Sequence, residues 1–235
     1  MFNTSHQLKS IVLLHGWGGS YASVWRENSW EERLVTAGYE VEEIDLPGHG
    51  NAERSHDPQG YADLASSIAQ RLPNARPITA IGYSLGAKVL LEIAARNPDI
   101  FGTLVLAGLG ANVFAPEKAG ELIADVLEQG VNDATPATIR GFVSYGLEAG
   151  NDPLALAACL RRPPNPVITA DRLAKIRCRT LVIAGDRDTV ALPLEPLASV
   201  LPNHTLLLLK DIDHLGLPAA PEFADAVMRF LDSRA

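Results

Sequence analysis

Six short apolar segments are spread along the chain, and polar stretches with helical periodicity lie between most of them. The apolar segments are Ser10–His15, Tyr39–Asp45, Pro77–Gly82, Thr103–Ala107, Thr180–Gly185 and His204–Lys210. Most are nearly continuous runs of Val, Ile, Leu and Ala, which is typical of parallel strands covered on both faces. Helical patterns occupy Trp30–Ala37, Tyr61–Arg71, Leu85–Arg96 and Pro221–Leu231. This alternation predicts a doubly wound α/β sheet of six mostly parallel strands.

The regular spacing of strands is lost between Gly108 and Leu173. Helical patterns replace it over Pro116–Glu128, Pro136–Glu148 and Pro153–Leu160, each starting at a proline suited to a first helical turn. Ordered loops of this length are rare, so a helical insertion is the better interpretation. We expect a helical cap over residues 109–173, inserted into a core made of residues 1–108 and 174–235. An ordinary extension of the core is the alternative.

Composition and charge narrow the class of protein. A chain of 235 residues suits one α/β domain with an insertion. The formal net charge is -8, and no run of Lys and Arg offers a nucleic-acid surface. Cys159 and Cys178 form no spaced metal or redox motif and are expected to be reduced thiols.

Targeting and membrane signals are also missing from the sequence pattern. The first ten residues show no basic and then apolar leader, and no apolar stretch is long enough to span a bilayer. We expect a cytoplasmic protein with no nucleic-acid or membrane partner and no metal. The sequence leaves the oligomeric state open.

The pentapeptide Gly82-Tyr83-Ser84-Leu85-Gly86 lies between a predicted strand and a predicted helix. A serine on such a turn is the nucleophile elbow of serine hydrolases, which holds the hydroxyl clear of the sheet. Side chains at the two glycine positions would collide with the neighbouring strand and helix. A glycine-rich turn with a surface serine is the alternative, and the order of strand, turn and helix argues against it.

His15-Gly16-Trp17-Gly18-Gly19 follows the first strand. A flexible loop with a buried tryptophan is one interpretation. The other is an oxyanion hole, in which fixed backbone N–H groups stabilise the negative charge that acyl transfer places on the carbonyl oxygen. The two donors would be the amides of Trp17 and Leu85. We expect His15 to hold the loop by hydrogen bonds.

A carboxylate that orients a histidine is the next requirement of this chemistry. Two candidates follow the fifth strand, Asp186 and Asp188. We favour Asp188, because its longer excursion from the strand reaches further toward the serine. Asp186 is expected to form the turn.

His214 is the candidate base among six histidines, because it lies just beyond the carboxyl end of the sixth strand. His204 begins that strand and would lie at the opposite end of the sheet. His49 follows the second strand and is expected near the site without a catalytic role. Trp17, Ser84, Asp188 and His214 thus follow four different strands, at the sheet edge where open parallel sheets bind ligands.

With these motifs in place, the chain resembles the α/β-hydrolase superfamily over nearly its whole length. The matching segments are His15-Gly16, Asp45-Leu46-Pro47-Gly48-His49-Gly50, Gly82-Tyr83-Ser84-Leu85-Gly86, Gly185-Asp186-Arg187-Asp188 and His214. The resemblance implies an α/β-hydrolase fold with Ser84 as nucleophile, His214 as base, Asp188 as acid, and Trp17 and Leu85 as oxyanion donors.

Two details refine the resemblance. The alternative acid position of the family, after the strand that follows the nucleophile, here reads Gly108-Leu109-Gly110-Ala111-Asn112 and holds no carboxylate. His15-Gly16-Trp17-Gly18 is similar to the loop of some small bacterial carboxylesterases, including those that cleave methyl esters of acyl-carrier-bound chains. Only about ten residues precede the first strand, too few for the antiparallel hairpin often found there, so a trimmed sheet is expected.

The expected reaction is two-step hydrolysis of a small-molecule carboxylic ester through an acyl-enzyme, without a cofactor. Phe114, Phe142 and Tyr145 are expected to line the substrate pocket, although each could instead pack on the core. Arg161 and Arg162 could attract an acidic substrate, with a solvated helix end as the more conservative interpretation. Other chemistries open to these groups are hydrolysis of a C–C bond, peracid formation and lyase chemistry. A slow-turnover ligand receptor or a non-catalytic scaffold are the alternatives of another class.

Overall fold

The six strands among the described residues run parallel in one twisted sheet. The computed structural model describes residues 9–74, 77–114, 119–164 and 168–233. The strands are β1 (Lys9–Leu14), β2 (Tyr39–Ile44), β3 (Ile78–Tyr83), β4 (Phe101–Ala107), β5 (Arg179–Gly185) and β6 (His204–Leu209). Their order across the sheet is β2-β1-β3-β4-β5-β6, with parallel pairing throughout. The expected six-stranded parallel sheet is confirmed.

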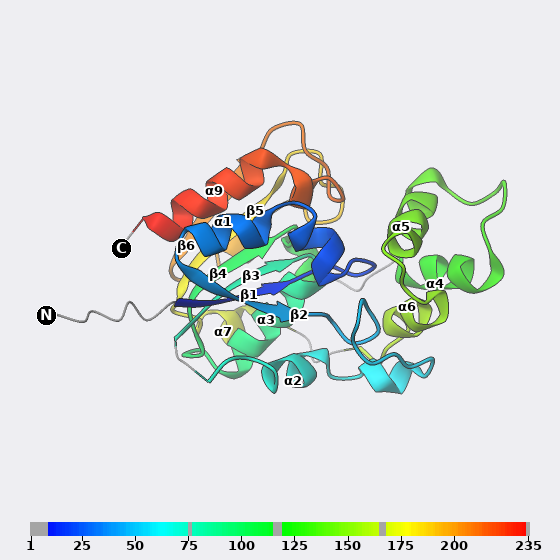
Figure 1. Cartoon of the computed structure of the whole chain (residues 1–235), viewed down its shortest axis with the longest axis horizontal. Helices are drawn as coiled ribbons and strands as arrows, with labels where there is room; N and C mark the ends of the chain where they lie inside the picture. The colour runs from blue at the N-terminus through cyan, green and yellow to red at the C-terminus, as the bar shows by residue number, and fades with distance from the viewer. Residues whose placement is uncertain (1–8, 75–76, 115–118, 165–167, 234–235) are drawn as a thin grey trace, which may run out of the picture.

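Helices cover both faces of this sheet (Figure 1). One face carries α1 (Trp30–Thr36) and α9 (Pro221–Asp232), and the other carries α2 (Leu64–Ala69), α3 (Leu85–Arg96), α7 (Ala170–Leu173) and α8 (Glu195–Ala198). Within β1, Ile11 and Leu13 pack in the core beneath α1 and α9. Val12 and Leu14 point to the other face and pack in the larger core, beneath α2, α3, α7 and α8. Burial on both faces explains why the inner strands β1, β3, β4 and β5 are rich in apolar residues.

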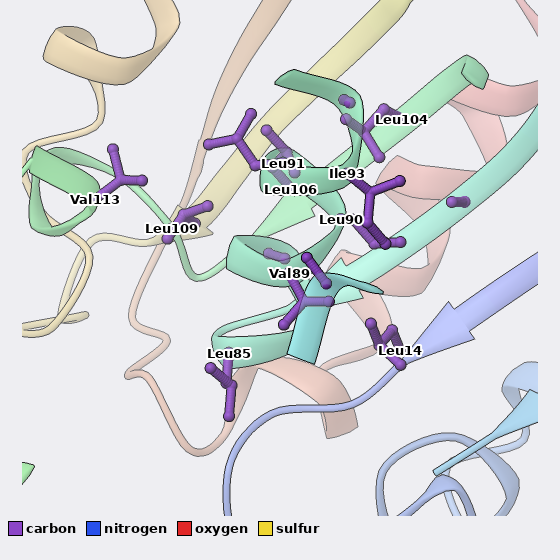
Figure 2. Close-up of a cluster of buried hydrophobic side chains, with 14 of the residues drawn as sticks. Leu14, Leu85, Val89, Leu90, Leu91, Ile93, Leu104, Leu106, Leu109 and Val113 are labelled. Carbon is purple, nitrogen blue, oxygen red and sulfur yellow. The ribbon is translucent and has the colours of Figure 1, made fainter. Parts of the chain in front are cut away.

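Helix α3 is the central element of the larger core. Figure 2 shows its leucines, Val89 and Ile93 packed against side chains of β1 and β4, with Leu109 and Val113 beyond the end of β4. Because α3 starts directly after Ser84, this packing also fixes the position of the serine relative to the sheet.

Several short elements were not expected from the sequence pattern. They are the π-helix η1 (Ala22–Arg26) and the 3-10 helices η2 (Pro58–Tyr61), η3 (Ala111–Phe114) and η4 (Leu217–Ala219). The expected helix Tyr61–Arg71 is shorter than predicted. Asp63 accepts a hydrogen bond from the amide of Ser66 and so starts α2 at Leu64, after the separate turn of η2.

Three helices between β4 and β5 form a separate group, here called the helical layer. They are α4 (Gly120–Gln129), α5 (Ala137–Glu148) and α6 (Pro153–Leu160). Their apolar side chains, among them Ile123, Val143 and Leu156, make a cluster of their own. Figure 1 shows the layer apart from the helices that cover the two sheet faces. Trp17, which follows the carboxyl end of β1, packs against this cluster.

The bounds of the three helices differ in part from those expected. Helix α6 begins at Pro153 as predicted, and α5 begins one residue after Pro136. Helix α4 begins at Gly120, whereas the expected start at Pro116 lies outside the described residues. In the ranges given above, no helix is both long and apolar enough to cross a membrane.

Candidate active site

Ser84 lies on the turn between β3 and α3 with an unusual backbone conformation. Its φ of 51° and ψ of -114° belong to a region that residues with side chains rarely adopt. The amide of Ser84 donates a hydrogen bond of 2.8 Å to the carbonyl oxygen of Ala107 at the end of β4. The turn is therefore held by the neighbouring strand while the Ser84 hydroxyl points away from the sheet.

The glycines on either side of the serine are required by space. A β-carbon at Gly82 would lie 2.6 Å from the Cα of Ala87 in α3. A β-carbon at Gly86 would overlap the carbonyl oxygens of Leu14 and His15 at the end of β1. The glycines thus allow the first turn of α3 to pack directly on the sheet edge, as the sequence predicts.

The structure brings Ser84, His214 and Asp188 into one chain of hydrogen bonds. His214 Nε2 lies 2.9 Å from Ser84 Oγ, and His214 Nδ1 lies 2.8 Å from Asp188 Oδ2. A carboxylate only accepts hydrogen bonds, so Nδ1–H donates to Asp188 and Nε2 is left to accept the hydroxyl proton. An imidazole in this position can act as a general base toward the serine.

Asp188 is completely buried, at 0 % exposure, yet its carboxylate is well supported. Oδ2 bonds the His214 ring, and Oδ1 accepts hydrogen bonds of 2.9 and 2.8 Å from the amides of Val190 and Ala191. The competing candidate, Asp186, is exposed and accepts a bond from the amide of Asp211. Only Asp188 therefore contacts the histidine.

The backbone after β1 runs directly beside the serine. A β-carbon at Gly16 would lie 2.9 Å from the Tyr83 ring and 3.2 Å from the Cβ of Ser84, so a side chain here would crowd both residues. Trp17 is the next residue of the loop. Leu85 is the first residue of α3, and the first N–H groups of a helix have no partner within the helix. Both candidate oxyanion amides thus belong to segments that adjoin Ser84.

Behind the loop, His15 and Asp45 connect the ends of β1 and β2. His15 Nε2 accepts a hydrogen bond of 3.1 Å from the amide of Leu46, which leaves Nδ1–H to donate to the Gly16 carbonyl at 2.8 Å. Burial disfavours the charged form of Asp45. However, the amides of Asn51 and Tyr21 donate to the carboxylate, outweigh burial and hold the pKa of this carboxyl below its ordinary range. The pattern of the sequence gave no indication of this role for Asp45.

A cavity of about 430 Å³ opens above Ser84, between the sheet edge and the helical layer. Its walls are mostly apolar, but they include several polar groups. The lining residues are Trp17, Ser84, Leu85, Lys88, Leu109, Asn112, Ala119, Gly120, Ile123, Phe142, Leu160, Arg162, Thr189, Val190 and His214. A concave, largely apolar cavity with a few convergent polar groups is the usual form of a small-molecule site.

The three aromatic residues expected in the pocket have different positions. Phe142 lines the cavity, and its ring centroid lies 6.3 Å from that of His214. Tyr145 instead packs on the loop after β1, where its ring would lie 3.1 Å from a β-carbon at Gly18. Phe114 in η3 is 36 % exposed.

The two adjacent arginines, Arg161 and Arg162, also have different surroundings. Arg161 pairs with three carboxylates of α4 and so ties α6 to α4; its partners are Glu121, Asp125 and Glu128. Arg162 lines the cavity and donates to the carbonyl of Cys159 at 2.7 Å. Lys88 also lines the cavity and was missed by the sequence analysis. Its spacing of four residues from Ser84 on the same helix was the available signal.

No group of three or more His, Cys, Asp or Glu side chains is placed to hold a metal ion within the described residues. Cys159 and Cys178 are both buried, and neither forms a disulfide.

Comparison with known proteins gives one family. The model of the alpha/beta hydrolase family matches residues 11–226. The chain is 35% identical over 103 residues to the pimeloyl-[acyl-carrier protein] methyl ester esterase of Methylococcus capsulatus, which covers 44% of this chain and 38% of that protein. The enzyme of the same name from Chromobacterium violaceum is 27% identical over 261 aligned positions, covering 99% of this chain and 98% of that protein. The chain thus spans less than half the length of the first of these relatives.

A solved structure shows the same fold. The esterase EaEST from Exiguobacterium antarcticum superposes with a TM-score of 0.75, and the match covers 96% of this chain and 92% of that one. Its sequence identity is 18%, so the likeness concerns the fold.

Proposed function

Because this chain belongs to the alpha/beta hydrolase family, we propose that it is a serine hydrolase that cleaves carboxylic esters of small or medium acyl groups. The observation that carries the proposal is the chain of hydrogen bonds from Ser84 Oγ through His214 to the buried Asp188, at 2.9 and 2.8 Å. An ester is favoured over other substrates of such a site because the relatives with matching sequence are named as esterases.

The proposed reaction has two steps. Ser84 Oγ attacks the ester carbonyl carbon while His214 Nε2 takes the hydroxyl proton, and the carbonyl π electrons move onto oxygen. The amides of Trp17 and Leu85 stabilise this oxyanion. When the C–O bond to the alcohol breaks, His214 returns the proton to the leaving alkoxide. Water then repeats the sequence on the acyl-enzyme and regenerates Ser84. These side chains supply every proton transfer, so the proposal includes no metal or organic cofactor.

The helical layer takes the part of a cap in this proposal. We assign residues 109–173 to the cap segment and residues 1–108 and 174–235 to the hydrolase core; within the segment the helical layer covers the site, whereas α7 packs back against α3. The cavity between them is large enough for a small or medium acyl group. Its wall from the layer includes Ile123, Phe142 and Leu160, so acyl-chain preference would be set there. The reduced thiols are the feature that favours a cytoplasmic location.

The first test uses p-nitrophenyl esters of increasing acyl length with the wild-type protein and the Ser84→Ala variant. We expect turnover by the wild type, and a fall in kcat of about a thousandfold or more in the variant, because the nucleophile is lost. Circular dichroism checks that the variant is folded. Purified Ser84→Ala protein that retains wild-type turnover would contradict the assignment.

A fluorophosphonate label located by mass spectrometry tests the nucleophile independently. We expect modification of Ser84 alone. Stoichiometric labelling of Ser84 together with negligible ester turnover would favour a receptor, or a reaction other than ester hydrolysis, over the esterase proposed here.

A further inference from the structure

One buried amide in the helical layer makes four contacts with backbone groups around the loop after β1. Asn151 lies between α5 and α6 and is 6 % exposed. Its Nδ2 lies 2.7 Å from the carbonyl oxygen of Gly18, 3.2 Å from that of Gly19 and 3.3 Å from that of Gly146. Its Oδ1 accepts a hydrogen bond of 2.8 Å from the amide of Gly50.

These partners determine the orientation of the amide. The opposite orientation would place the Asn151 carbonyl oxygen against three other carbonyl oxygens and its NH₂ group against the N–H of Gly50. Asn151 therefore acts as a donor toward the loop after β1 and as an acceptor from the loop after β2. A single side chain of the helical layer thus joins two loops of the sheet edge.

The loop that Asn151 holds contains residues with unusual backbone freedom. Gly18 has a φ of +79° and Gly19 follows it, so two residues without side chains come directly after Trp17. The helical layer makes further contacts with this stretch. Tyr145 packs on Gly18, and the indole N–H of Trp17 donates to the Leu156 carbonyl at 3.2 Å. The layer therefore holds the loop at several points, and Asn151 bonds the backbone of Gly18 and Gly19, whereas His15 bonds that of Gly16.

We propose that Asn151 is a positioning residue that, through Gly18 and Gly19, fixes the amide of Trp17 beside Ser84, so that the helical layer controls the oxyanion hole as well as the acyl pocket. This inference rests on the proposed function, because it takes the Trp17 amide as an oxyanion donor. A backbone donor stabilises the oxyanion only where it already points at the position that the charge will take. Loss of the Asn151 contacts frees that amide to move while leaving the serine, histidine and aspartate in place.

Two substitutions test the inference. Asn151→Ala removes all four contacts. Asn151→Asp keeps the shape and the acceptor for Gly50, but faces the three carbonyl oxygens with a carboxylate. We expect each to lower kcat by about 10- to 100-fold, somewhat less than the complete loss of one oxyanion donor. The KM for p-nitrophenyl esters should stay within about threefold, because the acyl pocket is unchanged.

An inhibitor that forms a tetrahedral adduct with Ser84 provides a second measurement. Its inhibition constant would not change if Asn151 had a purely structural role. A trifluoromethyl ketone adds to Ser84 Oγ, and its carbonyl oxygen becomes an oxyanion as the hydroxyl proton passes to His214. Its inhibition constant should rise in parallel with the loss of kcat/KM in both Asn151 variants. Asn132→Ala is the matched control, because Asn132 bonds only local groups in the α4–α5 connection among the described contacts. It should keep the wild-type kcat and inhibition constant.

The outcomes separate this inference from the proposed function. Each variant is assayed at a temperature below the midpoint of its thermal unfolding. If the alanine variant does not fold, the aspartate variant provides the test. An active wild type, together with Asn151 variants whose kcat and inhibition constant stay within about twofold, overturns the inference and leaves the esterase proposal intact. A wild type that neither hydrolyses esters nor labels at Ser84 would instead refute the proposed function itself.

Discussion

The carboxylate of Asp188 determines which nitrogen of the His214 ring carries the proton. Both oxygens of Asp188 accept hydrogen bonds, one from His214 and the other from the amides of Val190 and Ala191. Because the two amides hold one oxygen in place, the other is always presented to Nδ1. The ring is therefore kept in the tautomer whose Nε2 can accept the proton of Ser84.

Asp188→Asn tests this argument at the scale of one atom. The two backbone amides would keep the oxygen of the new side chain, so its NH₂ group would face Nδ1 of His214. The ring would then carry its proton on Nε2 and could no longer accept one from Ser84. We expect kcat to fall by about a thousandfold or more, with little change in KM, as measured by initial rates on a p-nitrophenyl ester.

Asp186→Asn is the matched control for that substitution. Asp186 follows the same strand, but its carboxylate bonds the amide of Asp211 and makes no contact with the His214 ring among the described hydrogen bonds. Its kcat should remain within about threefold of wild type. A larger loss in the Asp186 variant than in the Asp188 variant would exchange the roles of the two carboxylates.

The residues of the candidate site differ in how much of their position the sequence reveals. Ser84 is placed by a local pattern, in which a strand, two glycines and a helix follow one another within a few residues. Asn151 has no such pattern, because its contacts with Gly18 and Gly19 join segments more than 130 residues apart. Tyr145 was expected in the pocket because it is aromatic. Which side of α5 faces the cavity depends on how the helical layer packs on the sheet edge, and this packing places Tyr145 on the loop after β1.

At the scale of elements, the contact between α3 and β1 determines how close the serine comes to the glycine loop. Gly86→Ala would bring a β-carbon onto the Leu14 and His15 carbonyls, which are backbone groups and cannot turn aside. We expect a loss of about 2–3 kcal/mol or more in the free energy of unfolding, measured by urea denaturation. Activity should fall as well, since relief of the overlap moves the start of α3 away from the loop.

Gly141→Ala is the control for a glycine that has no such neighbour. Gly141 lies in the interior of α5, and a β-carbon there would meet nothing within 4 Å among the described residues. The same change should therefore stabilise the protein by about 0.5–1 kcal/mol, through better helix propensity. Equal destabilisation by both substitutions would contradict the role given to the α3–β1 contact.

The elements that were predicted well are those whose pattern is set by burial on two faces or by one strong boundary. The four inner strands, β1, β3, β4 and β5, were found because both of their faces are covered by helices, whereas the edge strands β2 and β6 remain partly exposed. Helix α2 was predicted too long, because the apolar spacing from Tyr61 onward continues through the Asp63 cap that separates η2 from α2. The π-helix η1 was missed because its conformation depends on contacts with the loop after β2, such as the bond between Tyr21 and Asp45.

At the scale of the whole molecule, the loops after β1 and β2 and the helical layer meet around the buried ring of His49. Its Nδ1–H donates to the Pro47 carbonyl at 3.0 Å, and Nε2 has no hydrogen-bond partner among the described residues. Burial lowers the pKa of His49 to about 3, and the nearby charge of Arg162 acts in the same direction, whereas the hydrogen bond to the Pro47 carbonyl and the Asp45 carboxylate oppose it. The folded protein therefore keeps this ring neutral.

The neutral ring makes stability depend on pH in a defined direction. In the unfolded chain a histidine binds its proton near pH 6.5, whereas His49 in the folded protein resists protonation down to pH about 3. Below about pH 6.5 the unfolded state therefore holds more protons, and the free energy of unfolding falls as the pH falls. Asp45 adds little to this loss above about pH 4.5, because its carboxyl is then largely ionised in both states.

His49→Asn measures this linkage, because the asparagine amide can still donate to the Pro47 carbonyl but does not titrate. Between about pH 7 and pH 4.5 we expect the wild type to lose about 2 kcal/mol more of its unfolding free energy than the variant does. Urea denaturation at several pH values in this window gives both slopes. If the two proteins lose the same amount, His49 must take up its proton in the folded state, and the meeting point of the two loops and the helical layer would have to admit a charge. The difference between the two slopes thus measures how strongly the folded protein excludes a charge from the buried His49 ring.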